Sequence, residues 1–191
     1  MKLVQLATAA AAFAGASAQV TTFTREVHIK SVVGPKSEAS TKKLVGAADF
    51  MPMPPPIECD DMWDDNGISC IYIASNTTVL VTDLSLGNVT MPDNNPDFVV
   101  SPPATIGAEG GWFSFHTLYS ASDQTFQAWS GEVQYTAKDS AGNTYIFSVT
   151  LDFGPDMIDM GFMFPQWHGI DVTPEVFYDP EWATGFQITD K

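Results

Sequence analysis

The sequence has few basic residues. Only 8 of its 191 residues are Lys or Arg, against 23 Asp and Glu, and the formal net charge is −15. Residues 44–191 contain only Lys138 and Lys191 as basic side chains. Binding to nucleic acids or anionic lipids depends on cationic groups that displace counterions. The composition therefore argues against a nucleic-acid partner.

Helical patterning and catalytic motifs are also missing. No segment carries a 3.6-residue apolar repeat, and no internal repeat of solenoid or propeller length is present. The histidines (His28, His116 and His168) have no metalloprotease spacing, and the chain has no Gly-x-Ser-x-Gly motif. With 23 acids, chance carboxylate pairs are expected, so a glycosidase is unsupported. We expect a non-catalytic protein without a cofactor, unless calcium binds.

Long apolar runs are absent except at the N-terminus. Residues 1–18 combine Lys2, an alanine-rich stretch too short to span a bilayer, and the small-residue pattern Ala16-Ser17-Ala18. This pattern is typical of a secretory signal peptide. We therefore expect a secreted, extracellular protein.

Cysteine is scarce, with only Cys59 and Cys70 in the chain. In an oxidising compartment two such residues are expected to pair. A disulfide here would close a short loop and stabilise the fold by about 3 kcal/mol through restriction of the unfolded chain.

Residues 19–57 precede the expected domain, and their first part, residues 19–43, is poor in large apolar side chains. They include the dibasic pair Lys42-Lys43, which is either a processing site that frees a pro-segment or part of a flexible or edge-pairing arm. The stretch MPMPPPIE, residues 51–58, cannot form a helix because proline fixes φ and lacks a backbone donor. We expect a proline-rich lead-in to a single domain over residues 58–191.

The remaining chain has the pattern of strands and turns. Residues 71–74 and 78–84 are rich in β-branched and aromatic side chains, and residues 130–149 alternate apolar and polar side chains around the turn sequence KDSAGN. The aromatic tail after Gly154, broken by prolines, predicts two further short strands. Short strands separated by turn signals predict an antiparallel β-sandwich.

Several segments resemble the aegerolysin family and, more loosely, actinoporin-like sandwich cytolysins. The resemblance covers residues 68–155 and includes an Asn-Thr pair after a strand, a Pro-Pro-x-x-Ile-x-x-Gly segment and a Gly-x-Val-x-Tyr hairpin. The matching positions are Asn76, Thr77, Pro102, Pro103, Ile106, Gly107, Phe113, Phe115, Gly131, Val133, Tyr135, Asp139, Gly142 and Asn143. The resemblance implies a protein that recognises sphingolipid- or sterol-rich membranes, in some members together with a pore-forming partner protein.

Exposed aromatic side chains are the expected ligand contacts. Such rings adsorb at a lipid interface or stack on sugars, whereas the alternative role is packing inside the sandwich. The candidates are Trp63, Trp112, Tyr119, Trp129, Trp167 and Trp182. A secreted effector or carbohydrate-binding module is the alternative to membrane binding.

The segment between the two cysteines is strongly acidic. Its carboxylates are the oxygen ligands that calcium prefers, but their spacing does not match an EF-hand loop. A solvated acidic loop is the alternative. The candidate calcium ligands are Asp60, Asp61, Asp64 and Asp65.

Two sequons mark Asn76 and Asn88 as candidate glycosylation sites. Both asparagines are therefore expected at the surface. The side chain of Asn76 could alternatively bond to the backbone of a local turn.

Overall fold

The computed structural model describes residues 24–32, 59, 65, 67–91, 98–120, 122–155, 157–166, 168–177 and 183–191. Throughout these ranges the regular elements are strands, which confirms the predicted all-β fold class. None of the described residues form a helix that is long and apolar enough to cross a membrane.

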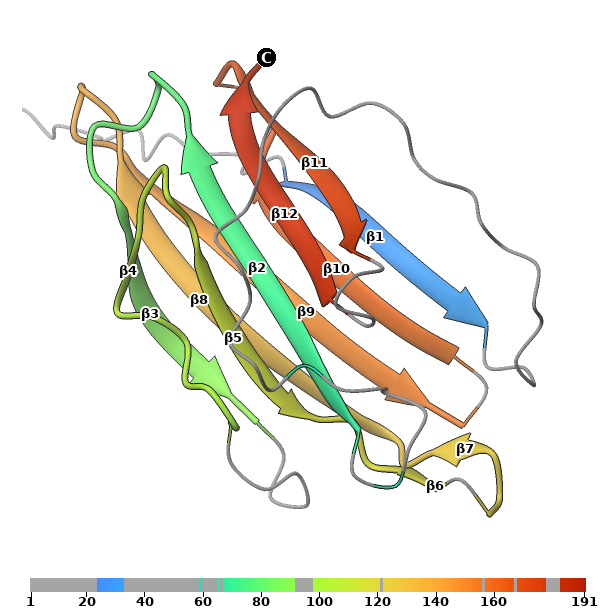
Figure 1. Cartoon of the computed structure of the whole chain (residues 1–191). Coiled ribbons are helices and arrows are strands. Elements are labelled where there is room, and N and C mark those ends of the chain that lie inside the picture. Colours follow the sequence, from blue (N-terminus) through green and yellow to red (C-terminus); the bar gives the residue numbers. More distant parts are fainter. Residues whose placement is uncertain are drawn as a thin grey trace, which may run out of the picture.

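Ten of the strands form two sheets that lie one in front of the other (Figure 1). The six-stranded sheet is antiparallel throughout and has the order β1 (Thr24–Val32), β10 (Met157–Pro165), β9 (Thr144–Gly154), β8 (Trp129–Lys138), β3 (Leu84–Thr90) and β4 (Thr105–Ile106). The four-stranded sheet has the order β11 (Ile170–Phe177), β12 (Ala183–Asp190), β2 (Ile68–Asn76) and β5 (Gly111–His116). A small hairpin joins β6 (Tyr119–Ser120) to β7 (Thr125–Phe126).

One pairing departs from the antiparallel pattern. Strand β12, the last in the chain, lies parallel to β2, with Ala183 opposite Cys70 and Thr189 opposite Asn76. The two strands are separated by more than one hundred residues. Because this pairing is not local, neither strand carries a sequence signal for it.

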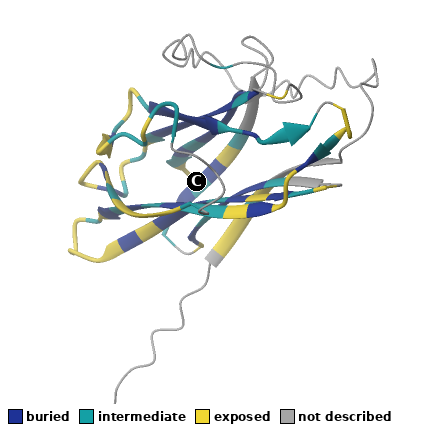
Figure 2. Ribbon diagram, turned by 90° about the horizontal axis from the view of Figure 1, so that it is seen from below, coloured by how far each residue is buried: buried dark blue, intermediate teal, exposed yellow. Residues whose placement is uncertain are grey.

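The β8–β9 hairpin forms as its alternation predicts. Tyr135 pairs with Phe147 and Val133 with Val149, and all four side chains are buried. Their neighbours on the opposite face are more exposed, so buried and exposed bands alternate along the strands in Figure 2. This alternation places one face of the six-stranded sheet in the core, as expected for a half-buried sheet.

The core is rich in aromatic rings from both sheets. Phe115 of the four-stranded sheet meets Trp129 and Phe153 of the other sheet in edge-to-face contacts, with centroids 5.6 and 6.0 Å apart. Trp129 also stacks on Phe153, with centroids 4.4 Å apart and an interplanar angle of 11°. Such pairs add to the free energy of burial.

The predicted N-terminal arm contains an edge strand. Residues 24–32 form β1, which pairs with β10 over its whole length. Arg25 of β1 makes a 2.8 Å ion pair with Asp171 of β11 and lies over the Phe164 ring. This segment therefore bridges the two sheets at one edge, while Lys42-Lys43 lies outside the described residues.

Two local predictions are wrong. Residues 78–84 were expected to form a strand, but β3 begins only at Leu84, and Thr77 and Thr78 instead donate hydrogen bonds to Asp190. The tail after Gly154 supplies three strands, β10, β11 and β12, where two were expected. In both cases long-range pairing decides the outcome.

A matched pair of variants tests the buried face of β9. Phe147 is fully buried, whereas its neighbour Ile146 is 55% exposed. Phe147→Ala should lower the free energy of unfolding by about 3–5 kcal/mol because it removes a buried ring and leaves a cavity. Ile146→Ala should change it by about 0.5 kcal/mol or less. Urea denaturation measures both, and equal losses would contradict this arrangement of β9.

A cluster of ionisable groups joins β1 to β10. His28 Nδ1 lies 2.7 Å from Asp159 Oδ1, and His28 Nε2 lies 2.9 Å from Glu26 Oε2. The hydrogen bond to Asp159 and, to a smaller extent, that to Glu26 raise the pKa of His28 above its ordinary value, although burial opposes this shift. The protonated imidazole is therefore favoured in the folded protein.

The raised pKa of His28 gives a testable pH dependence. The stabilisation that depends on this shift should be complete below pH 6.5, the ordinary pKa of histidine, and should be lost as the pH rises through the higher folded-state value. The difference in unfolding free energy between wild type and His28→Gln should therefore shrink as the pH rises. Denaturation at several pH values measures it, and a difference that grows with pH would contradict the assigned contacts.

Candidate functional site

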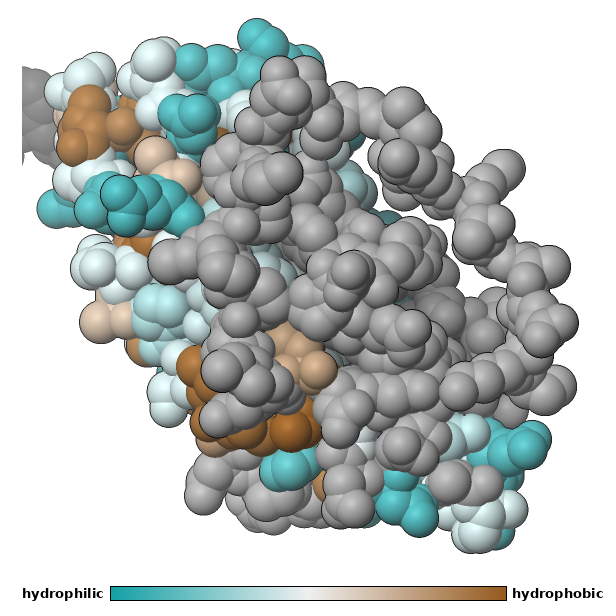
Figure 3. Space-filling view, in the orientation of Figure 1, coloured by the Kyte–Doolittle hydropathy of each residue, from teal (hydrophilic) through white to brown (hydrophobic). Residues whose placement is uncertain are grey.

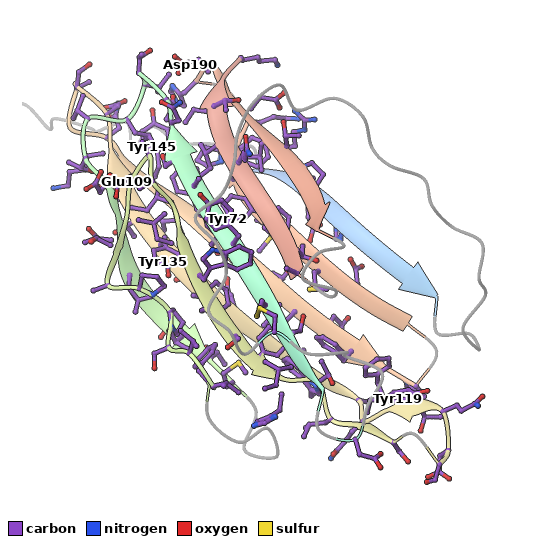
Figure 4. All side chains as sticks on the ribbon, viewed as in Figure 1. Tyr72, Glu109, Tyr119, Tyr135, Tyr145 and Asp190 are labelled. Carbon is purple, nitrogen blue, oxygen red and sulfur yellow. A yellow bond between two sulfur atoms is a disulfide. The ribbon has the colours of Figure 1, made fainter. Side chains whose placement is uncertain are left out.

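Several connections meet at one end of the sandwich, which we call the loop end. It comprises residues 76–83, 107–110, 139–143, 166, 168 and 169 together with Lys191. Hydrogen bonds tie these connections together, including Ser75 N to Gly107 O at 3.1 Å and Lys191 N to Gly169 O at 2.6 Å. Glu109, Tyr145 and Asp190 are labelled at this end in Figure 4, whereas Tyr119 lies at the opposite end. Connections from distant parts of the chain thus meet at this end.

A shallow, open hollow lies at the loop end. Its lining comes from the end of β2, from the β2–β3 connection and from the turn before β5. The lining residues are Ser75, Asn76, Thr77, Leu80, Val81, Thr82, Asp83 and Ala108. The described surface at this end is mainly teal or pale in Figure 3. The hollow therefore offers hydroxyl, amide and carboxylate groups next to a small apolar patch.

Asp190 holds one wall of this hollow in place. Its Oδ1 accepts hydrogen bonds from the Thr77 hydroxyl and from Thr78 N at 2.8 Å, and its Oδ2 accepts one from Thr78 Oγ1 at 2.8 Å. These donors, led by the Thr77 hydroxyl, lower the pKa of Asp190. The C-terminal strand thereby fixes the loop that replaces the expected strand.

Asp139 organises the neighbouring β8–β9 turn. Its Oδ1 accepts hydrogen bonds from Ala141 N and Asn143 N, both at 2.9 Å, and its Oδ2 accepts from Asn143 Nδ2 and the Tyr145 hydroxyl, both at 2.8 Å. The Asn143 side chain is the main cause that lowers the pKa of Asp139 to about 2. Gly142 supplies the positive φ of 84° that this turn needs. The turn is therefore rigid and carries a negative charge.

The hollow also has defined backbone supports. Thr82 Oγ1 accepts a 2.9 Å hydrogen bond from Lys138 N, and Val81 N donates one of 2.8 Å to Lys138 O. A Cβ atom built on Gly107 would lie 2.9 Å from Asp83 Oδ1, so this carboxylate lies directly against the glycine. Hydroxyls and a carboxylate held on a supported loop are suited to hydrogen bonding with a polar, neutral ligand.

Three of the predicted aromatic contacts fall in the part of the chain that the structure describes, and none of these three lines the hollow. Trp112 and Trp129 are buried, with 7% and 5% of their surface exposed, because both rings pack against other side chains. That burial does not fit the expected surface role of these two rings. Tyr119 is partly exposed and contacts Phe126 at the end opposite the loop end. Trp63, Trp167 and Trp182 lie outside the described residues.

The other predicted sites have different outcomes. The disulfide between Cys59 and Cys70 is present, with a Cα–Cα distance of 5.6 Å. Of the proposed calcium ligands, Asp65 is exposed, whereas Asp60, Asp61 and Asp64 lie outside the described residues. Asn76 and Asn88 are both exposed, as glycosylation requires, although their modification stays a prediction.

Sequence reasoning missed most of the residues that line the hollow. Asn76 was identified only as a sequon, and Ser75, Thr82, Asp83 and Ala108 carried no signal of their own. The segments come together through the bonds to Asp190 and Gly107, which join distant parts of the chain. A single sequence does not record such contacts.

Comparisons with known proteins assign no family. No family model, no curated protein and no solved structure matches the chain. The structure itself shows an all-β protein with two main sheets.

The low pKa of Asp139 predicts how acid affects the turn. A carboxylate with a lowered pKa stabilises the fold above its ordinary pKa of 3.8, and this contribution is lost as the pH falls towards about 2. Asp139→Asn should therefore be less stable than wild type at neutral pH, and the difference should shrink in acid. Denaturation between neutral pH and pH 2 measures it. A difference that is independent of pH would contradict the charged role of Asp139.

Proposed function

We propose that this protein is a secreted, non-catalytic protein that binds a neutral glycan at the loop end. The observation that supports this most directly is the hollow, in which Asn76, Thr82 and Asp83 are close to one another. Amide, hydroxyl and carboxylate groups exchange hydrogen bonds with sugar hydroxyls without needing a charged ligand. Secretion is proposed from residues 1–18 and agrees with the disulfide.

Charge limits the class of ligand. The chain has a net charge of −15, and Asp83, Glu109, Asp139 and Asp190 are at or next to the loop end. Phosphate-rich or anionic partners would be repelled by this surface. A neutral sugar would meet no such repulsion, and its hydroxyls would find acceptors in the carboxylates.

A sphingolipid- or sterol-rich membrane surface is the second candidate. It is supported by Val81, an apolar side chain in the lining of the hollow that is 60% exposed, and by the aegerolysin-like pattern of the sequence. A zwitterionic headgroup does not oppose a negative protein as an anionic one does. In this reading the protein adsorbs to the bilayer and recruits a pore-forming partner protein. The burial of Trp112 and Trp129 removes aromatic contacts that either ligand could use. We place the membrane second because most residues that line the hollow are polar.

A parallel binding assay separates the two candidates. Pull-down on insoluble polysaccharides and a glycan array test sugars, and co-sedimentation with phosphatidylcholine vesicles, with and without sphingomyelin and cholesterol, tests membranes. We expect binding to a neutral glycan and no sedimentation with vesicles. Sedimentation only with sphingomyelin or cholesterol would support the second candidate, and binding to neither would contradict both.

Paired aspartate variants locate the contact. Asp83→Ala should weaken glycan binding about 10-fold, because hydrogen bonds that involve a charged group contribute about 1.5–3 kcal/mol. Asp152 is also exposed but lies on β9, in register with Ser130 and outside the hollow lining, so Asp152→Ala should bind as wild type does. Isothermal titration calorimetry measures both affinities. Equal affinities of wild type and Asp83→Ala for the glycan would contradict a binding site at the hollow.

A further inference from the structure

The four-stranded sheet buries side chains on its outer face as well as on its inner face. Phe113 and Phe115 belong to the core between the sheets, whereas Tyr72, Trp112 and Cys70 form a separate buried cluster with Ala74 and Ala183. Along β5, Trp112 and Ser114 alternate with the two core phenylalanines, so they face away from the other sheet. We call this cluster, together with Ser114, the outer aromatic face.

The outer aromatic face is more deeply buried than a solvent-facing sheet surface should be. Tyr72 is 0% exposed, Ala74 2% and Trp112 7%. Cys59 packs against this cluster and is joined to it by the disulfide with Cys70. The disulfide thereby holds Cys59 at this face, and in the sequence residues 51–57 come shortly before Cys59 on one flank while the acidic loop follows on the other.

We propose that the chain's own proline-rich segment, residues 51–57, docks on the outer aromatic face as an internal ligand. Polyproline segments bind surfaces formed by closely spaced aromatic rings, because their extended conformation is already fixed and little entropy is lost. Tyr72 and Trp112 form such a pair, with centroids 4.9 Å apart and planes inclined at 46°. The segment contains the Pro-x-x-Pro spacing at Pro52 and Pro55.

The lengths of the two flanks favour this segment over the acidic loop. The loop that follows Cys59 must return to Gly67, whose carbonyl accepts hydrogen bonds from Thr117 N and Oγ1 beyond the end of β5. Tyr72 and Ala74 lie on β2 beyond Cys70, in the direction away from Gly67. At a rise of 3.3 Å per residue, they lie about 7 and 13 Å from Cys70 along the strand. Residues 54–56 precede Cys59 by three to five positions, or about 9–16 Å in a polyproline helix. The proline run therefore matches the distance to Tyr72 and Ala74.

Ser114 gives an independent reason to place a peptide here. Its hydroxyl is 0% exposed and has no hydrogen-bond partner, although it lies on the outer face opposite Cys70. A buried, unpaired hydroxyl is costly, whereas a peptide carbonyl above it would accept its proton. A proline segment suits this position, since it presents carbonyl acceptors and no amide donors that would stay unpaired.

The Tyr72 ring is fixed in a position that fits this role. Its hydroxyl donates a 2.9 Å hydrogen bond to the Glu109 carbonyl. A Cβ atom at Gly110, where φ is 77°, would lie only 2.1 Å from the Tyr72 hydroxyl, so the ring lies directly over this glycine. An aromatic platform that is already ordered loses little entropy when a ligand binds.

Residue-resolved hydroxyl-radical footprinting of the full-length protein tests the proposal. The variant Pro54→Ser/Pro55→Ser/Pro56→Ser keeps the disulfide but removes the rigid proline surface. Oxidation of Tyr72 and Trp112 should rise several-fold in this variant, while Tyr135 in the main core should stay protected. Asp60→Ser/Asp61→Ser, which changes the other flank of Cys59, is the matched control and should leave all three residues as in wild type.

A peptide supplied in trans completes the test. Adding a synthetic peptide of residues 50–58 to the triple-proline variant should restore protection of Tyr72 and Trp112, and Ser114→Ala in that background should weaken the peptide about 5-fold, as expected for one hydrogen bond. Unchanged protection in the triple-proline variant would overturn the proposal. So would loss of protection in Trp63→Ala with the prolines intact, because the acidic loop would then be the cover.

Discussion

The structure depends on the burial of alternate side chains between two β-sheets. Every long strand with a described burial pattern devotes one face to this layer, and aromatic rings such as Phe115, Trp129 and Phe153 meet across it. Large rings exclude water from a wide area, so a small number of strands suffices for a substantial core. The same burial removes Trp129 from the surface.

The loop end follows from how the strands terminate. Asp190 lies at the end of β12, beside β2, and accepts hydrogen bonds from the threonines that follow β2. Asp139 accepts hydrogen bonds within the β8–β9 turn. Both carboxylates act by accepting several hydrogen bonds, which keeps their pKa values low and their loops ordered. The hollow is thus a consequence of strand pairing and of two acidic anchors.

The outer aromatic face and the loop end have contrasting chemistry. The first is apolar, deeply buried and tethered to a proline-rich segment through Cys59, whereas the second is open, hydroxylated and acidic. The edge strand β1 adds a third contrast, since Arg25 places a positive charge beside Asp171 and the His28 imidazole lies against Asp159 in an otherwise acidic protein. Residues upstream of the sandwich therefore contribute to its edge, and by our proposal to its outer face as well.

The sequence by itself determined the features that depend on local physics. Alternation set which side chains of β8 and β9 are buried, Gly142 and Asp139 specified the turn, and the two cysteines could pair only with each other. Tertiary structure decided the rest. The parallel pairing of β12 with β2, the capture of Thr77 and Thr78 by Asp190, and the burial of Trp112 all join residues that are distant in the chain. Such contacts leave no periodicity in a single sequence, because their energy arises only when the strands pack together.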